Sequence, residues 1–372
     1  MNDIKIIRQD ITPGRRILVT SDIHGYLNYL KNVLEMANFC DDDLLIIIGD
    51  VVEKGPESLK TLRYVMELCE KENVIVLAGN VDLRRVNMIE DINESNANDF
   101  YNYLLSQRKW KGTSIFDEMA AECNIEINSA ADVLSSKNTV LEHFKPGLDY
   151  LRSRPTLLET QEFIFVHGGM PQKSLDDIQS LNVWNFLKYD NFMATEQCFD
   201  KYIVVGHWPV TLYGDKIPQL NPIINKEKKI ISIDGGCGLK KEGQLNLIEI
   251  PNIYCDVGDI KTYSYDELPV CVAAENQSCS DDSINIKRTD NKIIELETKG
   301  DFTYAEHVST GRKFWIPNDF IYSEHRCDDY TDYVLPVKKD DMLKIVKATS
   351  RGYIVKKDGV TGWYYGEVEK AR

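Results

Sequence analysis

Metal-binding side chains follow five short apolar runs between residues 22 and 207. The segments are Asp22-Ile23-His24-Gly25, Gly49-Asp50, Gly79-Asn80, His167-Gly168-Gly169 and Gly206-His207. Carboxylate, amide and imidazole groups together are suitable ligands for Mn, Fe or Zn, and they differ from the thiolates of a soft metal site. Two such ions about 3.5–4 Å apart can hold a bridging hydroxide and clamp the attacking and leaving oxygens of a phosphoryl group. The pattern predicts a two-metal hydrolytic site.

The spacing within the segments supports a shared site. Asp22 and His24 lie two residues apart, so both can reach one cation if the chain turns at Gly25. Asp50 can bridge two ions through its two oxygens, and Asn80 offers a neutral carbonyl oxygen. A single Asp-x-His is a common accident, and one histidine after a strand is more often a packed core residue. Three of the six histidines in this ordered pattern favour a site over coincidence.

Alternating strands and helices must position these residues. Apolar runs predict strands at residues 16–21, 44–48, 73–78, 162–166, 202–205, 230–234 and 245–250. Apolar residues at helical spacing predict helices after Tyr26 and after Pro56. Strand–helix alternation with short connections is typical of a layered α/β domain, expected over residues 1–260.

The alternation stops in two places. Residues 83–155 are polar and predict a helical insertion beside the site, with helices at residues 98–109, 129–134 and 139–144. Residues 262–282 predict a linker, because Ser, Asp, Asn and Gln cluster near their end.

The tail consists of short alternating runs and turns. Thr310-Gly-Arg-Lys-Phe-Trp315 is echoed 48 residues later by Asp358-Gly-Val-Thr-Gly-Trp363. This period predicts two small β units, residues 283–330 and 331–372, each SH3-like. The aromatic run from Trp363 to Tyr365 has two possible roles: a groove for a peptide ligand, or packing, either onto the enzyme or inside the barrel.

Composition excludes several classes of protein. A net charge of -15 argues against binding to nucleic acid or to a membrane surface, because a protein that binds either one needs a basic surface. No run approaches the length of a membrane-spanning helix, and residues 1–10 lack the apolar core of a signal peptide. The nine cysteines are scattered, as expected for free thiols in the cytoplasm.

With their flanking residues, the five segments resemble the metallophosphoesterase (calcineurin-like) superfamily, over about residues 16–250. The sequences of these motifs are most similar to the phosphoprotein-phosphatase branch of the superfamily, which includes bacterial serine/threonine phosphatases and symmetrical diadenosine tetraphosphatases. The matching stretches are Ser21-Asp-Ile-His-Gly, Gly49-Asp-Val-Val-Glu-Lys-Gly-Pro, Val166-His-Gly-Gly, Gly206-His-Trp-Pro and Ile233-Asp-Gly-Gly-Cys-Gly. The resemblance implies an α/β fold, a two-sheet αββα sandwich, followed here by the small all-β SH3-like region. It assigns one divalent ion to Asp22, His24 and Asp50, and the other to Asp50, Asn80, His167 and His207.

The chain departs from the pattern at three positions that matter for catalysis. Val81 stands where the family has the histidine that protonates the leaving oxygen, and loss of such an acid costs roughly 10²–10⁴-fold. Glu53 replaces the aspartate that supports this histidine, and Lys54 replaces a phosphate-binding arginine. We hypothesise that Glu53 has become the acid. Arg84 or Arg85 could restore a phosphate contact, or form a solvated helix face.

Two functions are consistent with the sequence. One is a phosphoesterase that uses two divalent ions, Mn²⁺ being expected and Fe or Zn being alternatives. Its substrate would be a phosphorylated small molecule or a phosphoprotein, as for nucleoside polyphosphate hydrolases or serine/threonine phosphatases. The other is a pseudo-phosphatase scaffold that binds a peptide or protein through its SH3-like tail.

Overall fold

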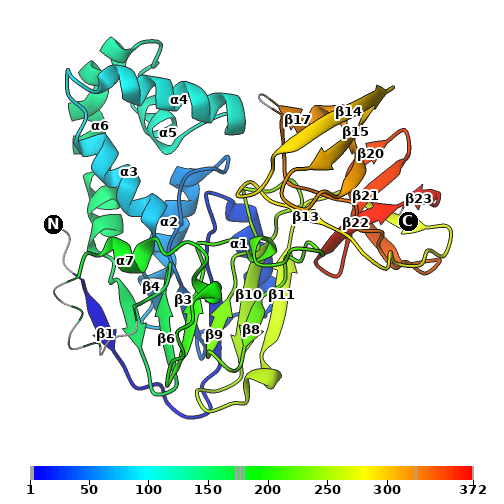
Figure 1. Ribbon diagram of the computed structural model, residues 1–372. Coiled ribbons are helices and arrows are strands. Elements are labelled where there is room, and N and C mark those ends of the chain that lie inside the picture. Colours follow the sequence, from blue (N-terminus) through cyan, green and yellow to red (C-terminus); the bar gives the residue numbers. More distant parts are fainter. Residues whose placement is uncertain (1–3, 172–174, 176–177, 179–180, 323–324, 371–372) are drawn as a thin grey trace. The chain divides into compact units, whose positions relative to one another are not determined.

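The computed structural model describes residues 4–171, 175, 178, 181–322 and 325–370. The chain forms two compact units, an α/β unit and an all-β unit (Figure 1). The α/β unit comprises Met1–Pro209 and Pro222–Tyr265, and the all-β unit comprises Val210–Asn221 and Asp266–Arg372.

Two sheets form the centre of the α/β unit. The five-stranded sheet has the order β11-β10-β2-β3-β4, with strands β11 (Lys261–Tyr265), β10 (Leu245–Ile250), β2 (Ile17–Thr20), β3 (Leu44–Ile47) and β4 (Val74–Val76). The six-stranded sheet has the order β1-β5-β6-β7-β9-β8, with strands β1 (Ile6–Arg8), β5 (Leu157–Glu159), β6 (Phe163–Val166), β7 (Tyr202–Val205), β9 (Ile230–Ser232) and β8 (Ile223–Asn225). Strands β2, β3 and β4 run parallel, as do β6, β7 and β9.

Alternation along the central strands explains the layers. Ile17 and Val19 point into a core shared with Phe165 of the other sheet, whereas Leu18 points into a second core formed with the helices. Helices α1 (Leu27–Met36) and α2 (Ser58–Leu68) supply buried residues to that second core. The predicted layered α/β fold is therefore confirmed.

The helical insertion packs on the same helix layer. It contains α3 (Asn80–Glu90), α4 (Ala97–Lys111), α5 (Ile115–Glu122) and α6 (Ala130–Ser153), drawn in blue to green in Figure 1. The prediction of separate helices at residues 129–134 and 139–144 is wrong, because α6 continues through the polar stretch between them. Ser136 and Val140 are both buried there, so the buried face of the helix is unbroken.

Helix α5 also contacts the start of α2 through Glu118. Its carboxylate accepts hydrogen bonds from the backbone N–H groups of Ser58 (3.0 Å) and Leu59 (2.8 Å). Burial raises the pKa of Glu118 from 4.5 to about 7, and the nearby Glu53 adds to the rise. Between pH 4.5 and about 7, the folded chain holds a proton on Glu118 that the unfolded chain has released. The free energy of unfolding therefore falls as pH rises through this range.

We therefore expect Glu118→Gln to remove a fall in stability between pH 4.5 and about 7. At about 1.36 kcal/mol per pKa unit, this fall amounts to at most about 3 kcal/mol. Urea unfolding at both ends of the window measures it. Glu122→Gln, on the same helix but paired with the exposed Arg63, is the control and should keep the fall. An unchanged pH dependence in Glu118→Gln would contradict the prediction.

The all-β unit contains two small apolar cores and several antiparallel sheets. The five-stranded sheet has the order β22-β21-β20-β12-β23, with strands β22 (Val360–Tyr364), β21 (Gly352–Lys357), β20 (Met342–Thr349), β12 (Val270–Ala273) and β23 (Val368–Lys370). The three-stranded sheet comprises β14 (Ile293–Lys299), β15 (Phe302–His307) and β16 (Lys313–Pro317). The remaining pairs are β13 (Asn285–Ile286) with β19 (Tyr330–Thr331), and β17 (Ile321–Tyr322) with β18 (Arg326–Cys327).

One expectation for residues 262–365 fails, and the structure decides between two others. The predicted linker at residues 262–282 is wrong, because it contains most of β11 and all of β12, each paired in a different sheet. In the aromatic run, Trp363 is 2% and Tyr364 0% exposed, which matches the packing role, whereas Tyr365 is exposed. Trp363 donates its indole N–H to the carbonyl of Thr331.

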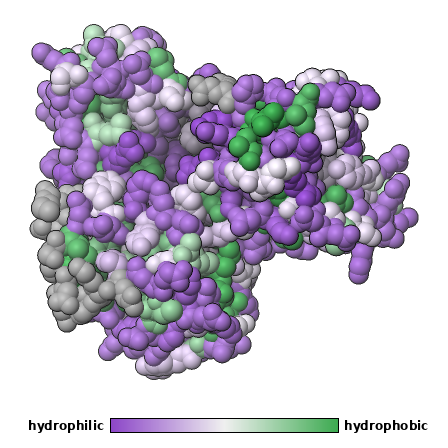
Figure 2. Space-filling view, viewed as in Figure 1, coloured by the Kyte–Doolittle hydropathy of each residue, from purple (hydrophilic) through white to green (hydrophobic). Residues whose placement is uncertain are grey.

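The face drawn in Figure 2 is largely hydrophilic, with several apolar areas, among them a strongly apolar patch on the all-β unit. The patch lies over β14, where Ile294 and Leu296 are about half exposed. No described helix is long and apolar enough to cross a membrane.

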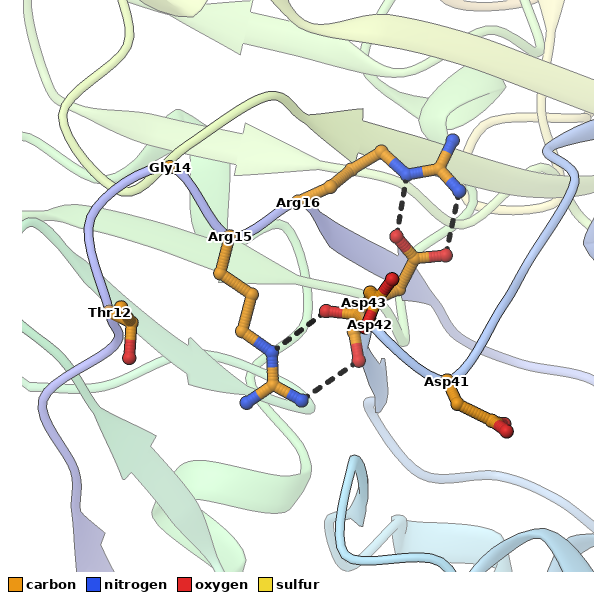
Figure 3. Close-up of a pocket in the computed structure, with 7 residues that line it drawn as sticks. All are labelled: Thr12, Gly14, Arg15, Arg16, Asp41, Asp42 and Asp43. Atoms are coloured by element: carbon orange, nitrogen blue, oxygen red, sulfur yellow. Dashed lines mark hydrogen bonds and ion pairs between the residues drawn. The ribbon is translucent and has the colours of Figure 1, made fainter.

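A pocket lies at the amino ends of β2 and β3 (Figure 3). Its lining comprises Thr12, Gly14, Arg15, Arg16, Asp41, Asp42 and Asp43. Both Arg16 guanidinium contacts to Asp43 are short, at 2.6 and 2.7 Å, and Arg15 donates to the Asp43 carbonyl. These arginines are thus engaged within the protein, and the pocket is at the strand ends opposite the metal-binding segments.

Candidate metal centre

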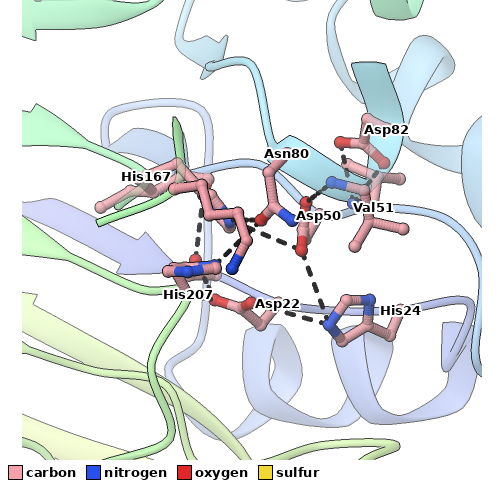
Figure 4. Close-up of polar contacts among 12 residues, drawn as sticks. Asp22, His24, Asp50, Val51, Asn80, Asp82, His167 and His207 are labelled. Atoms are coloured by element: carbon pink, nitrogen blue, oxygen red, sulfur yellow. Dashed lines mark hydrogen bonds and ion pairs between the residues drawn. The ribbon is translucent and has the colours of Figure 1, made fainter. Parts of the chain in front are cut away.

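The structure brings the six predicted ligands together at the carboxyl ends of parallel strands (Figure 4). Asp22 and His24 follow β2, and Asp50 follows β3. Asn80 begins α3 after β4, and the two histidines follow β6 and β7. Because β2, β3 and β4 are parallel, as are β6 and β7, their carboxyl ends present these groups at common sheet edges.

One group of ligands comprises Asp22, His24 and Asp50, whose candidate atoms all lie within 4.8 Å of one another. His24 Nε2 is 3.6 Å from Asp22 Oδ1 and 3.8 Å from Asp50 Oδ2. These separations are long for hydrogen bonds. They are close to the roughly 3.0–3.4 Å expected between two atoms that each bind one ion at about 2.1 Å. The donor set therefore fits a divalent cation.

The second group continues from Asp50. His167 Nε2 is 3.5 Å from Asp50 Oδ2 and 2.8 Å from Asn80 Oδ1, and His207 Nδ1 is 2.9 Å from the same amide oxygen. His167 Nδ1 is 2.7 Å from the Ile48 carbonyl, and donation there leaves Nε2 as the nitrogen with a lone pair. Asp50 thus lies between the two groups, as a bridging ligand must.

The backbone at these residues is unusual. Asp22, His24, Asp50 and His207 all have positive φ, between 52° and 63°. Residues other than glycine rarely adopt this backbone region, and such strain concentrates at functional sites. A Cβ at Gly79 would lie 2.1 Å from the Asp50 backbone nitrogen. Glycine there permits the close approach that brings the segments of Asp50 and Asn80 together.

Electrostatics also favour a cation here. Asp22 and Asp50 are nearly fully buried. Burial opposes a charge on His167, but Asp50 and Asp22 outweigh it and raise its pKa to about 10. Burial and the nearby His167 lower the pKa of His207 to about 4. The buried carboxylates thus draw positive charge to the site, a role that bound divalent ions would fill.

Several supporting residues were not singled out from the sequence. Asp82 accepts hydrogen bonds from the backbone N–H groups of Val51 and Val52 and so holds the turn after Asp50. Ser21 Oγ donates to Asp22 Oδ2 at 2.6 Å. Asp82, two residues past Asn80, could have been noticed from its spacing; Ser21 begins one of the matching stretches, but nothing in the sequence indicated that its hydroxyl contacts Asp22.

Asp190 contacts the outer nitrogen of a ligand, since its Oδ1 is 2.8 Å from His207 Nε2. Such a carboxylate fixes the orientation of the imidazole ring. We expect Asp190→Asn to weaken binding of one metal ion by about 10–100-fold, with little change in thermal stability. Calorimetric titration of the metal-free chain with Mn²⁺ measures this, with the exposed Asp200→Asn as control. Equal affinities in the two variants would contradict it.

The predicted catalytic residues are placed differently from one another. Lys54 extends toward the centre, with Nζ 3.0 Å from His24 Nε2. Arg84 is exposed, whereas Arg85 forms an ion pair with Glu53. Glu53 is fully buried, and both its oxygens already accept contacts from the protein. An acid must carry a proton and face the substrate, so these contacts do not favour Glu53 as the acid.

Residues 15–229 match the model of the calcineurin-like phosphoesterase family. The chain belongs to this family. The chain is similar to symmetrical bis(5'-nucleosyl)-tetraphosphatases, being 33% identical over 93 residues to that of Buchnera aphidicola subsp. Schizaphis graminum, or 25% of this chain and 33% of the relative. To that of Vibrio cholerae it is 28% identical over 159 residues, or 42% of this chain and 46% of the relative. The match thus spans less than half the length of these relatives.

A solved structure, a serine/threonine phosphatase from Saccharomyces cerevisiae, aligns with 71% of this chain and 84% of that one. The TM-score is 0.44 and the sequence identity 12%.

Proposed function

We propose that this calcineurin-like phosphoesterase hydrolyses a phosphoanhydride or an activated phosphate ester, with two divalent ions, preferably Mn²⁺, as cofactor. The observation that carries the proposal is the convergence of six oxygen and nitrogen ligands around Asp50. Bound ions would activate water and polarise the phosphoryl group. A nucleoside polyphosphate is the preferred substrate class, in keeping with the names of the similar tetraphosphatases.

The protein's own residues would then bind and orient the phosphoryl group. Lys54 is the cation nearest the ligands, and it supplies a compact charge to a phosphate oxygen. Val81 is buried, and its backbone N–H donates to Asp50 Oδ1 at 2.8 Å. It orients a ligand but provides no proton to a leaving group. This chemistry favours leaving groups that depart as stable anions.

A substrate panel tests the proposal. The chain is freed of metal, reloaded with Mn²⁺, and assayed on p-nitrophenyl phosphate, its bis ester, a phosphoserine peptide and diadenosine tetraphosphate. We expect turnover of the tetraphosphate and the nitrophenyl ester, little of the peptide, and loss of all activity in EDTA. Failure of every substrate despite two bound ions would sink the proposal.

The same failure would favour the scaffold alternative, in which the β units bind a protein. The exposed Ile294 and Leu296 on β14 support a docking role for this unit, whose SH3-like character stays a prediction. The buried Trp363 argues against an aromatic groove at that residue.

A further inference from the structure

Three elements of the helical insertion converge on one buried carboxylate, that of Glu53. The Tyr103 hydroxyl of α4 donates to Oε1, and Arg85 Nε of α3 lies 3.2 Å from the same oxygen. The backbone N–H of Ile115, at the start of α5, donates to Oε2 at 3.0 Å. The Arg85 guanidinium also stacks over the Tyr103 ring, 4.3 Å from its centroid. Glu53 is therefore held from three helices at once.

Glu53 is joined directly to the residue that reaches the metal centre. Glu53 and Lys54 are consecutive residues with positive φ, 74° and 68°. A pair of such conformations persists only where the surroundings impose it. The Glu53 backbone N–H donates to Ser58 Oγ at 3.0 Å, whereas the side-chain contacts to Tyr103, Ile115 and Arg85 all reach the insertion. Fixing this side chain fixes the turn from which Lys54 extends.

A buried ion pair is a poor way to gain stability. Burying charges costs several kcal/mol, and apolar residues of similar size often stabilise a protein as well or better. The Glu53–Arg85 pair is nevertheless almost fully enclosed, with side-chain exposures of 0% and 12%. A requirement for a defined local geometry accounts for the pair better than stability does.

We propose that Arg85 and Tyr103 are positioning residues, which act through Glu53 to aim the Lys54 ammonium at the phosphoryl group. The helical insertion is then part of the catalytic apparatus rather than an attached lid. This inference rests on the proposed function for the role of Lys54, and it replaces an acid role for Glu53 with a structural one at the site.

A double-mutant cycle tests the coupling. Tyr103→Phe removes one hydroxyl, and Lys54→Met removes the charge it is proposed to aim. Two quantities are measured on Mn²⁺-loaded protein: kcat for p-nitrophenyl phosphate, and the Kd for inorganic phosphate. We expect Tyr103→Phe to lower kcat and to raise the Kd, each by on the order of tenfold in the native background and by less than about twofold in the Lys54→Met background. Arg85→Gln should behave in the same way.

Matched controls separate positioning from folding. Tyr101→Phe removes a hydroxyl on the same helix that donates to the Asn128 carbonyl, away from Glu53, and should change neither quantity. Equal losses from Tyr103→Phe in both backgrounds would overturn the inference and assign the cluster to stability. If the wild-type chain turns over no substrate, the phosphate-binding cycle still decides: coupling there supports the positioning role while the proposed activity fails, and its absence overturns both.

Discussion

Asp50→Asn is expected to lower kcat/KM by on the order of 10³-fold or more, because a bound metal lowers the pKa of its water from about 15.7 to about 7. Asp50 Oδ1 accepts from the Val81 N–H, and Oδ2 lies 3.5–3.8 Å from the imidazoles of His167 and His24. An amide keeps the size of the side chain. It loses the charge that two cations would share, so the variant should bind at most one ion.

Metal content and activity are measured on the same preparations of this variant. Asp42→Asn is the matched control, since it makes the same change in an exposed residue at the amino end of β3. Wild-type activity with two bound ions in Asp50→Asn would mean that the six side chains do not form the reaction centre.

A steep dependence on the leaving group is the second large expected effect. Without a proton donor in the position of Val81, rates on substituted phenyl phosphates should fall sharply as the leaving phenol becomes more basic. Between an activated aryl ester and an alkyl ester the absent acid accounts for about 10²–10⁴-fold. A flat series would show that the chain has an acid that the proposal does not contain.

Two variants identify any such acid. If Lys54 only binds phosphate, Lys54→Met lowers every rate by a similar factor and leaves the slope unchanged. If Lys54 protonates the leaving oxygen, the slope becomes steeper. Glu53→Gln addresses the sequence-based hypothesis: a steeper slope would support an acid role for Glu53, and an unchanged pH–rate profile would exclude it.

The sequence predicted the layered core because strand-length apolar runs are local features. Strands β7 and β10 begin and end where the apolar runs do, since both are buried along almost their whole length. Short strands with few buried residues, such as β8, carried no such pattern and were missed. Helix α6 was divided in two because its exposed polar residues obscured a continuous buried face.

The candidate ligands could be chosen from sequence because each follows a recognisable strand. Their supporting contacts could not, because they join distant segments: Asp190 meets His207, and Arg85 meets Glu53 across 32 positions of the chain. The assignment of residues 210–221 to the all-β unit depends on similar long-range contacts, such as Leu220 N–H to the Gly359 carbonyl.

The left-handed backbone of four ligand residues also bears on how this protein can evolve. Each non-glycine residue held in that region costs on the order of 1–3 kcal/mol, so the metal-binding rim works against the stability of the rest of the fold. Glycine at Asp22 or Asp50 would relieve that cost and abolish a ligand. Variants selected only for heat resistance should therefore tend to lose their catalytic residues, and inactive but robust descendants are an accessible outcome for this scaffold.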